Sequence, residues 1–113
     1  MATAAREVAG EVLVALADPT RRRVLELIGA RGEDTATRLA GELPVTRVAV
    51  VKHLAVLDRA GLVEGRRRGR EVRYAVRPEP LRATAEWMGA IAREWDIRLA
   101  RLKELAEAEG IER

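Results

Sequence analysis

Apolar residues recur at helical spacing through the first 43 positions and predict three helices. The first is predicted over residues 5–16, where small and branched apolar residues form one stripe. Asp18 followed by Pro19 is typical of a helix start, an N-cap with proline in the first position, and predicts a second helix over residues 19–30. A short third helix is expected over residues 35–43. The predicted inward residues are Ala5, Val8, Ala9, Val12, Leu13, Leu16, Val24, Leu25, Leu27, Ile28, Leu39, Ala40 and Leu43.

A further apolar pattern predicts a helix over residues 46–60, directly after a proline. Pro44 cannot continue the third helix, Thr46 is a favourable N-cap, and Gly61 provides a helix end. Two helices joined by so short a break are typical of a helix-turn-helix. The spacing places Val50, Leu54 and Leu57 toward the core and Arg47, Val48, Val51, Lys52 and Ala55 on the opposite face. That face suits a DNA major groove, because valine can contact a thymine methyl group and Arg or Lys can contact guanine.

The residues beyond Gly61 alternate and predict a β-hairpin over residues 62–76. Its strands are expected at 62–67 and 70–76, around a turn at Arg68-Gly69. The expected buried face holds Val72, Tyr74 and Val76, and the expected wet face holds Glu71, Arg73 and Arg77. The arginines near the turn are Arg66, Arg67, Arg68, Arg70 and Arg73. A cationic hairpin beside such a helix is typical of a wing that contacts the phosphate backbone.

A long final helix is predicted over residues 81–109 by a heptad repeat of apolar residues. The repeat consists of Leu81, Ala85, Met88, Ala92, Trp95, Leu99, Leu102 and Ala106. Such a stripe requires another helix to cover it. Packing on the first helix and dimerisation with a second copy are both expected. The predicted dimerisation residues are Val8, Val12, Leu81, Met88, Trp95, Leu99 and Leu102.

Charge is distributed unevenly, although the net charge is only +3. Residues 43–78 carry nine basic and three acidic groups, residues 1–42 carry six and seven, and residues 79–113 carry six and eight. The middle third therefore holds the entire positive excess. Binding to phosphates by counterion release requires clustered Lys and Arg in this way. The alternative interpretation is a solvated basic face without a partner.

The composition favours one domain over residues 1–113 and excludes several classes of protein. No run approaches the roughly 20 apolar residues that span a bilayer, and no signal-peptide pattern is present, so we expect a cytoplasmic protein that does not bind a membrane. The lack of cysteine excludes disulfides and thiolate metal sites. No Ser/His/Asp set and no Gly-Lys-Ser/Thr phosphate loop occur, so neither an enzyme nor a cofactor is expected.

Several segments together carry a resemblance to a known family. They are Ala17-Asp18-Pro19-Thr20-Arg21, Val50-Val51-Lys52-His53-Leu54-Ala55-Val56-Leu57, Ala60-Gly61-Leu62-Val63, Arg68-Gly69-Arg70 and Tyr74. From about residue 8 to 105 the chain resembles the ArsR/SmtB family of bacterial winged-helix repressors. The resemblance implies a mainly α fold with a small β-hairpin, a winged helix-turn-helix of order α-α-α-α-β-β-α. It also implies a homodimer through the first and last helices.

The family's metal sensors are not matched by this sequence. Those repressors use cysteine pairs in the helix equivalent to residues 35–43, or sets of His, Asp and Glu in the last helix. This chain has no cysteine, and its single histidine, His53, lies in the predicted recognition helix. We therefore expect no metal site, and a sensor made of His53 and carboxylates is the least favoured alternative. Trp87 and the pattern Trp95-x-x-Arg98-Leu99-x-x-Leu102 resemble a subgroup without a recognised metal site.

The family's contact pattern implies which residues would touch DNA. Base-edge contacts are expected from Arg47, Val48, Val51 and Lys52, and phosphate contacts from Thr46, His53, Arg68, Arg70 and Arg73, with Arg66 and Arg67 beside them. The alternative for the two valines is core or dimer packing. The leading hypothesis is a homodimeric, sequence-specific repressor that binds an inverted repeat in double-stranded DNA. The alternative is a protein-interaction module that regulates DNA only with a protein co-regulator or an effector-binding subunit.

Overall fold

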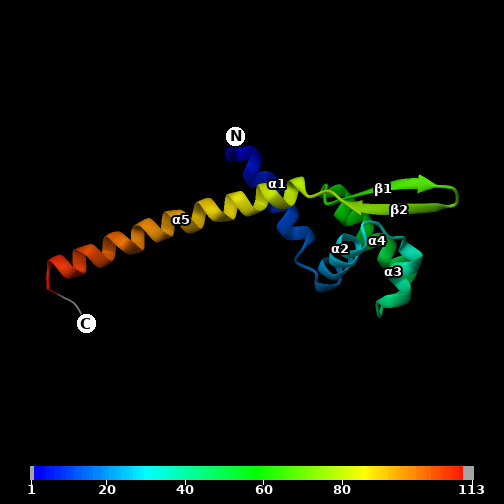
Figure 1. The fold of residues 1–113 in the computed structure, drawn as a ribbon, viewed down its shortest axis with the longest axis horizontal. Coiled ribbons are helices and arrows are strands. Elements are labelled where there is room, and N and C mark those ends of the chain that lie inside the picture. Colours follow the sequence, from blue (N-terminus) through cyan, green and yellow to red (C-terminus); the bar gives the residue numbers. More distant parts are fainter. Residues whose placement is uncertain (1, 111–113) are drawn as a thin grey trace.

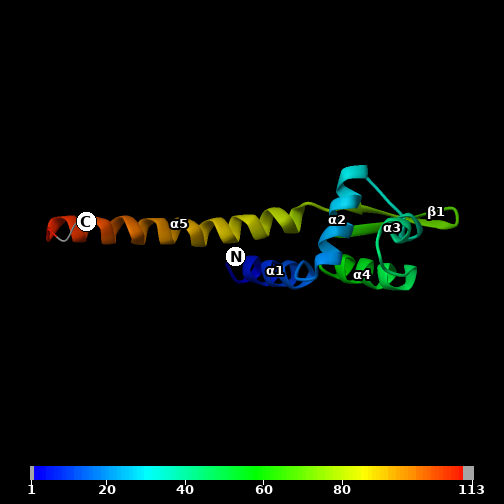
Figure 2. The ribbon, with the colours of Figure 1, turned by 90° about the horizontal axis from the view of Figure 1, so that it is seen from below.

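The computed structural model describes residues 2–110 and shows five helices and one hairpin (Figure 1). The elements are α1 (Ala2–Ala15), α2 (Pro19–Arg31), α3 (Ala36–Glu42), α4 (Arg47–Arg59), β1 (Val63–Arg68), β2 (Glu71–Val76) and α5 (Glu79–Ala108). This order confirms the predicted fold class. The molecule measures 71 × 32 × 20 Å, because α5 projects from the body as a single rod (Figures 1 and 2). The outermost residues of the predicted domain, 1 and 111–113, lie outside the described residues.

Side-chain caps define where α2, α3 and α4 begin, and the caps at Asp18 and Thr46 are those that the sequence predicts. The Asp18 carboxylate accepts hydrogen bonds from the backbone N–H groups of Thr20, at 2.8 Å, and Arg21, at 3.1 Å. These two bonds, that of Arg21 first, lower the pKa of Asp18 below its ordinary value. The hydroxyl of Thr46 likewise accepts from the N–H of Ala49 at 3.1 Å and begins α4. Each cap satisfies a helix N–H group that has no partner within its own helix.

The core lies where α2, α3, α4 and the base of the hairpin meet the carboxyl end of α1. Its fully buried large side chains are Val12, Val24, Ile28, Leu39, Val50, Leu54, Leu57, Leu62 and Val63. The predicted inward face of α4 is confirmed. In α1 the prediction fails at Leu13, which is 44% exposed, while Ala15 takes a buried place instead. Ala15 continues the buried face of Ala9 and Val12 and belongs to the same core cluster as Val12 and Val24.

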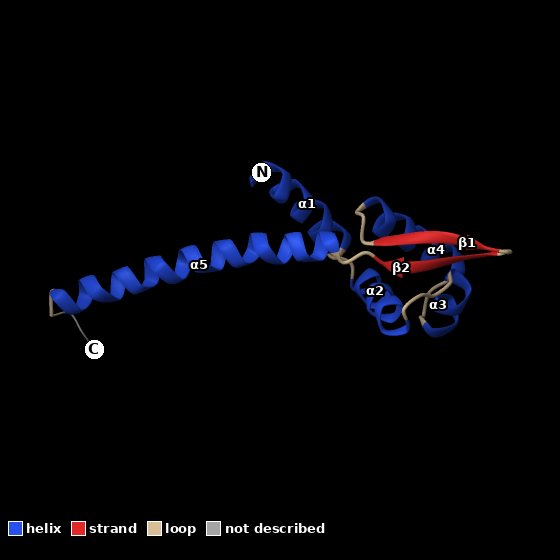
Figure 3. Cartoon of the chain, turned by 45° about the horizontal axis from the view of Figure 1, so that its top comes forward, coloured by secondary structure: helices blue, strands red, loops and turns tan. Residues whose placement is uncertain are grey.

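The hairpin differs from its prediction in two respects. Its two-residue loop is Gly69-Arg70 rather than Arg68-Gly69, because Arg68 pairs with Glu71 as the last pair of the ladder. The first loop position has a φ of +65°, which glycine adopts without strain. The predicted alternation holds in part. Tyr74 and Val76 pack against the core and Glu71 and Arg77 are exposed, but Arg73 is half-buried. The tip of the ribbon extends beyond the helices, and its residues 65–71 are all exposed (Figure 3).

A single aspartate fastens the hairpin to the helices. The backbone N–H of Asp34 donates to the carbonyl of Tyr74 at 3.0 Å, and the N–H of Tyr74 donates back at 2.8 Å. The Asp34 side chain is completely buried and accepts from Arg31 at 2.5 Å and from the N–H of Thr35 at 2.9 Å. Arg31 also forms an ion pair with Glu42 at the end of α3. These contacts hold the hairpin, α2 and α3 in one arrangement.

Helix α5 is covered only along its first part. There α1 packs against it, so the predicted packing of the last helix on the first is confirmed. Thr84 is buried in this first part, whereas every residue from Ile91 to Leu105 is exposed. Among residues 2–110, no helix combines the length and the apolar character needed to cross a lipid bilayer.

The ion pair between Arg31 and Glu42 predicts how stability changes in acid. The Arg31 guanidinium holds the pKa of Glu42 below its ordinary value of 4.5. The pair therefore contributes stability above pH 4.5, and this contribution is lost as the pH falls through the lower pKa of the folded state. We expect Glu42→Gln to lower the urea midpoint at pH 7 and to approach the parent protein below pH 4.5. Glu104→Gln, on the exposed part of α5, is the control; a Glu42→Gln difference that is constant with pH would contradict the prediction.

Candidate nucleic-acid interface

The face of α4 that points away from the core is exposed and carries both valine and lysine. Val48 is 64% exposed, and Lys52, one turn further on, is also exposed. The two lie opposite Val50, Leu54 and Leu57, which have no exposed surface. Val48 therefore does not pack in the core. A helix with one face buried and the other presenting an apolar and a cationic side chain can enter a major groove.

Arg47 and Val51 lie on a flank of α4 and not opposite the core, which corrects the sequence prediction. With about 100° per residue, both positions fall nearer to Leu54 than to Lys52 around the helix. They line a hollow of about 350 Å³ between α4, the start of α3 and the hairpin, where Tyr74 forms part of the wall. Arg47 donates from Nε to the hydroxyl of Thr37 at 3.1 Å. The Arg47 side chain is thus held at the edge of the outward face of α4, which carries Val48 and Lys52.

The arginines of the hairpin divide into paired and unpaired groups. Arg73 contacts Glu33 at 3.4 Å and Glu71 at 3.3 Å. Arg66 contacts Glu64 at 3.6 Å, and the same carboxylate group lies 3.8 Å from Arg77. Those with no ion pair to any residue in 2–110 are Arg67, Arg68 and Arg70. The cations at the hairpin tip are therefore the ones most available to an outside anion.

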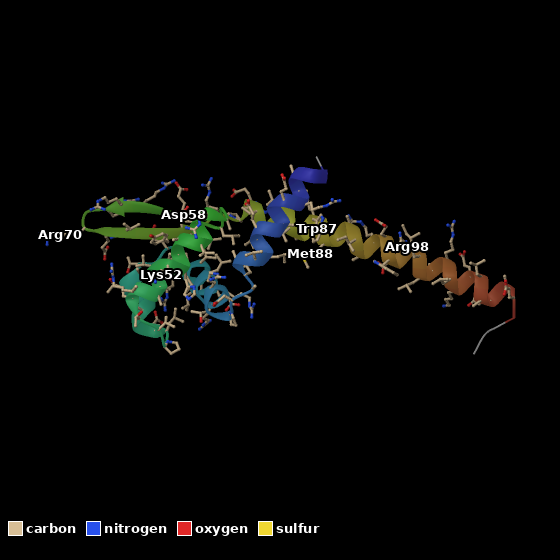
Figure 4. All side chains as sticks on the ribbon, turned by 180° about the vertical axis from the view of Figure 1, so that it is seen from behind. Lys52, Asp58, Arg70, Trp87, Met88 and Arg98 are labelled. Carbon is tan, nitrogen blue, oxygen red and sulfur yellow. The ribbon has the colours of Figure 1, made fainter. Side chains whose placement is uncertain are left out.

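The tip of the hairpin and the outward face of α4 lie at the same end of the molecule. Figure 4 shows Arg70 at the tip and Lys52 on α4, both far from Arg98 on α5. His53 is half-buried, and its Nδ1 lies 3.4 Å from the guanidinium of Arg21 on α2. Thr46 is exposed at the start of α4, with its hydroxyl engaged as the cap. The structure thus brings most predicted DNA contacts together and turns His53 toward α2.

The predicted dimerisation residues also divide by exposure. Met88, Trp95, Leu99 and Leu102 are between 50% and 60% exposed along one stripe of α5 (Figure 4 labels the first of them). Val12 is only 1% exposed because it belongs to the core of the monomer, and this corrects its proposed role in dimer contacts. Val8 and Leu81 are partly buried against the same core. The available surface therefore belongs mainly to α5.

Within residues 2–110, no group of three or more His, Asp or Glu side chains is arranged to hold a metal ion. Three residues that sequence reasoning missed instead organise the interface. Asp34 fixes the hairpin, Arg21 contacts His53, and Thr37 holds Arg47. Their partners are distant in the sequence or lie in another element, so no local pattern identifies them. In the sequence, the Asp-Pro-Thr-Arg start of α2 indicates a helix cap but not the contact of Arg21 with His53.

Comparison with known proteins agrees with this arrangement. A family model described as a helix-turn-helix domain matches residues 16–66. The transcriptional repressor SdpR of Bacillus subtilis is 30% identical over 68% of this chain and 84% of its own length. An ArsR-like transcriptional regulator from Rhodococcus sp. RHA1 is 42% identical, with a TM-score of 0.80 over 89% of this chain and 94% of that one.

A second solved structure shows a dimer. It is the homodimeric winged helix-turn-helix DNA-binding domain of Mb0332 from Mycobacterium bovis, described as a possible ArsR-family transcriptional regulator. It is 28% identical, with a TM-score of 0.63 over 81% of this chain and 84% of that one.

The pairing of the hairpin arginines generates a prediction for DNA binding. Arg68→Ala combined with Arg70→Ala should weaken binding to all duplexes alike, because these cations are free to meet phosphates. The slope of log K against log salt should fall by about 0.9 for each phosphate that the variant no longer neutralises. Arg66→Ala combined with Arg73→Ala, which also removes two cations but ones already paired with carboxylates, is the matched control and should have a smaller effect. Filter binding or fluorescence anisotropy across a salt series measures the affinity and its salt slope. An equal weakening by the variant and its control would contradict the division of the hairpin arginines into paired and unpaired groups.

Proposed function

Because the chain belongs to the ArsR family of winged helix-turn-helix DNA-binding transcriptional regulators, we propose that it is a homodimeric repressor of an inverted-repeat operator. The observation that supports this most is the joint exposure of the outward face of α4 and the unpaired cations of the hairpin tip. The first can read bases and the second can bind phosphates. As a reader of DNA, the protein is proposed to act in the cytoplasm.

Helix α4 is the proposed recognition helix, with its outward face in the major groove. Val48 and Lys52 occupy the centre of that face, where a valine methyl can contact thymine and an ammonium can contact guanine. Arg47 and Val51, on the flank, face the hollow beside the hairpin and suit the edge of the groove. The hairpin would follow the backbone alongside. Repression is favoured by the likeness to SdpR, which is itself a repressor.

The exposed stripe of α5 is the proposed dimer contact. Alanines at positions 85, 92 and 106 lie among the larger Met88, Trp95, Leu99 and Leu102 along this stripe. In an antiparallel pair centred between positions 92 and 95, the Trp95 side chain of each protomer would lie over Ala92 of the other. A parallel pair would set tryptophan against tryptophan and alanine against alanine, which leaves gaps. The antiparallel arrangement therefore fills the contact better.

In an antiparallel α5 pair, one reading head, meaning the part of each protomer that holds α4 and the hairpin, lies at each end. Such a dimer has two-fold symmetry, so its two recognition helices would meet two inverted half-sites. These would lie more than one DNA turn of roughly 34 Å apart, because about 14 residues of α5, at about 1.5 Å each, separate the dimer centre from each head. The Mycobacterium bovis domain supports a homodimer for this fold. A protein that binds DNA only in the presence of a separate co-regulator is the alternative outcome of the experiments below.

The dimer proposal predicts opposite results for two substitutions on α5. Leu102→Asp places a charge in the exposed stripe and should convert the dimer to a monomer. Ile97→Asp is the matched control, because Ile97 is 67% exposed but lies on the far side of the helix from that stripe. Light scattering coupled to size-exclusion chromatography gives the mass of each. A monomeric parent protein, or two variants that behave alike, would remove α5 from this role.

The proposed reading face predicts a change in base preference. Selection of duplexes from a random-sequence pool by the purified protein should give an inverted repeat. Lys52→Met should relax base choice at one position per half-site, by about 1–3 kcal/mol of discrimination. Lys103→Met, which removes a cation from the distal part of α5, should leave the selected sequence unchanged. If the parent protein selects nothing without added cell extract, the co-regulator alternative is favoured.

A further inference from the structure

The side chain of Arg21 joins three helices. Its Nε donates to the carbonyl of Ala15 at 2.6 Å, and one terminal nitrogen lies 3.5 Å from the carbonyl of Val14. Its other terminal nitrogen, Nη1, lies 3.4 Å from Nδ1 of His53. The side chain is only 18% exposed, so these contacts define its position. One cation on α2 therefore holds the carboxyl end of α1 and a side chain of the recognition helix.

The charge of Arg21 suits both ends of this link. The last carbonyl groups of a helix carry partial negative charge and favour a cation. At the other end, a neutral imidazole with its proton on Nε2 presents Nδ1 as an acceptor. The Asp18 carboxylate, 4.0 Å away, partly balances the guanidinium. A lysine could not replace Arg21, because one ammonium cannot reach the carbonyls and the imidazole from fixed, divergent directions.

The link connects two parts of the molecule with different proposed tasks. Helix α1 packs against α5, which carries the proposed dimer contact, whereas α2 packs against α4. Figure 2 shows the carboxyl end of α1 beside the start of α2 and next to α4. The tilt of α4 relative to the α1–α5 pair determines how two recognition helices are spaced in a dimer. Arg21 lies at the joint between these parts.

We propose that Arg21 is a positioning residue that orients the recognition helix through His53 and so determines operator discrimination. This inference rests on the proposed function, because it acts through α4 in a DNA-bound dimer. His53 accordingly serves the reading of DNA from within the protein rather than as a phosphate contact. Loss of the link leaves the cations of α4 and the hairpin in place. It should therefore weaken binding to the operator and spare binding to other DNA.

The test uses the 113-residue chain and four variants. Arg21→Met and His53→Leu each remove the contact between Arg21 and His53. The double variant loses the same single contact. His53→Gln is the conservative control, because its side-chain oxygen can accept from the guanidinium. The probes are a duplex selected by the parent protein from a random pool and a scrambled duplex of equal length. Circular dichroism confirms that each variant is folded at the assay temperature.

Each single substitution should weaken the selected duplex about tenfold and leave the scrambled duplex unchanged. The double variant should be no weaker than either single variant, and His53→Gln should retain the affinity of the parent. Equal weakening on both duplexes, or additive effects in the double variant, would overturn the proposal, since a phosphate contact of His53 produces that pattern.

Two further outcomes distinguish a failure of the proposed role of Arg21 from a failure of the proposed function. If Arg21→Met unfolds because its bonds to α1 are broken, the comparison of His53→Leu with His53→Gln decides, since neither variant alters those bonds; equal behaviour of the two would then overturn the proposal. Failure of the parent protein itself to select any sequence would contradict the proposed function instead.

Discussion

Three side chains of α4, those of Val50, Leu54 and Leu57, fill the centre of the core and have no exposed surface. Because an α-helix turns by about 100° per residue, this burial leaves Val48 and Lys52 no position except the outward one. The same constraint orients the neighbouring elements, since α2, α3 and the base of the hairpin all pack around this face. The exposed face of α4 with Val48 and Lys52 is thus a consequence of how the core is packed.

Ion pairs within the fold reduce the positive charge that the composition indicates. The middle third of the chain contains the whole positive excess, but carboxylates within and beside the hairpin neutralise part of it. Glu64 and Glu71 occupy the strands, and Glu33 reaches Arg73 from the loop after α2. Within the hairpin, the cations that remain unpaired among residues 2–110 are those at the tip, and α4 contributes Arg47, Lys52 and Arg59 in addition. A short row of free cations at the end of a ribbon gives a localised contact with phosphates, rather than a diffuse attraction over the whole domain.

Local chemistry made most of the fold predictable. Caps at Asp18 and Thr46 and the apolar periodicity located every helix to within three residues at each end. The sequence also pointed to the outward face of α4 and to the cationic hairpin. It could not show that Arg47 turns toward Thr37, or that Asp34 pairs with Tyr74, because these partners lie 10 and 40 positions apart. The turn was misplaced by one residue, since a glycine can take either loop position until the strand register is known.

The length of α5 has a consequence for how this protein could change over time. In the proposed antiparallel dimer, α5 would set the distance between the two reading heads: each added residue would lengthen the helix by about 1.5 Å and rotate everything beyond it by about 100°. One inserted residue would therefore carry the distal apolar residues away from the contact stripe. Insertions of a whole heptad keep the stripe nearly in line. The separation of the two heads is consequently adjustable only in coarse steps, which couples operator spacing to the helical repeat of the protein.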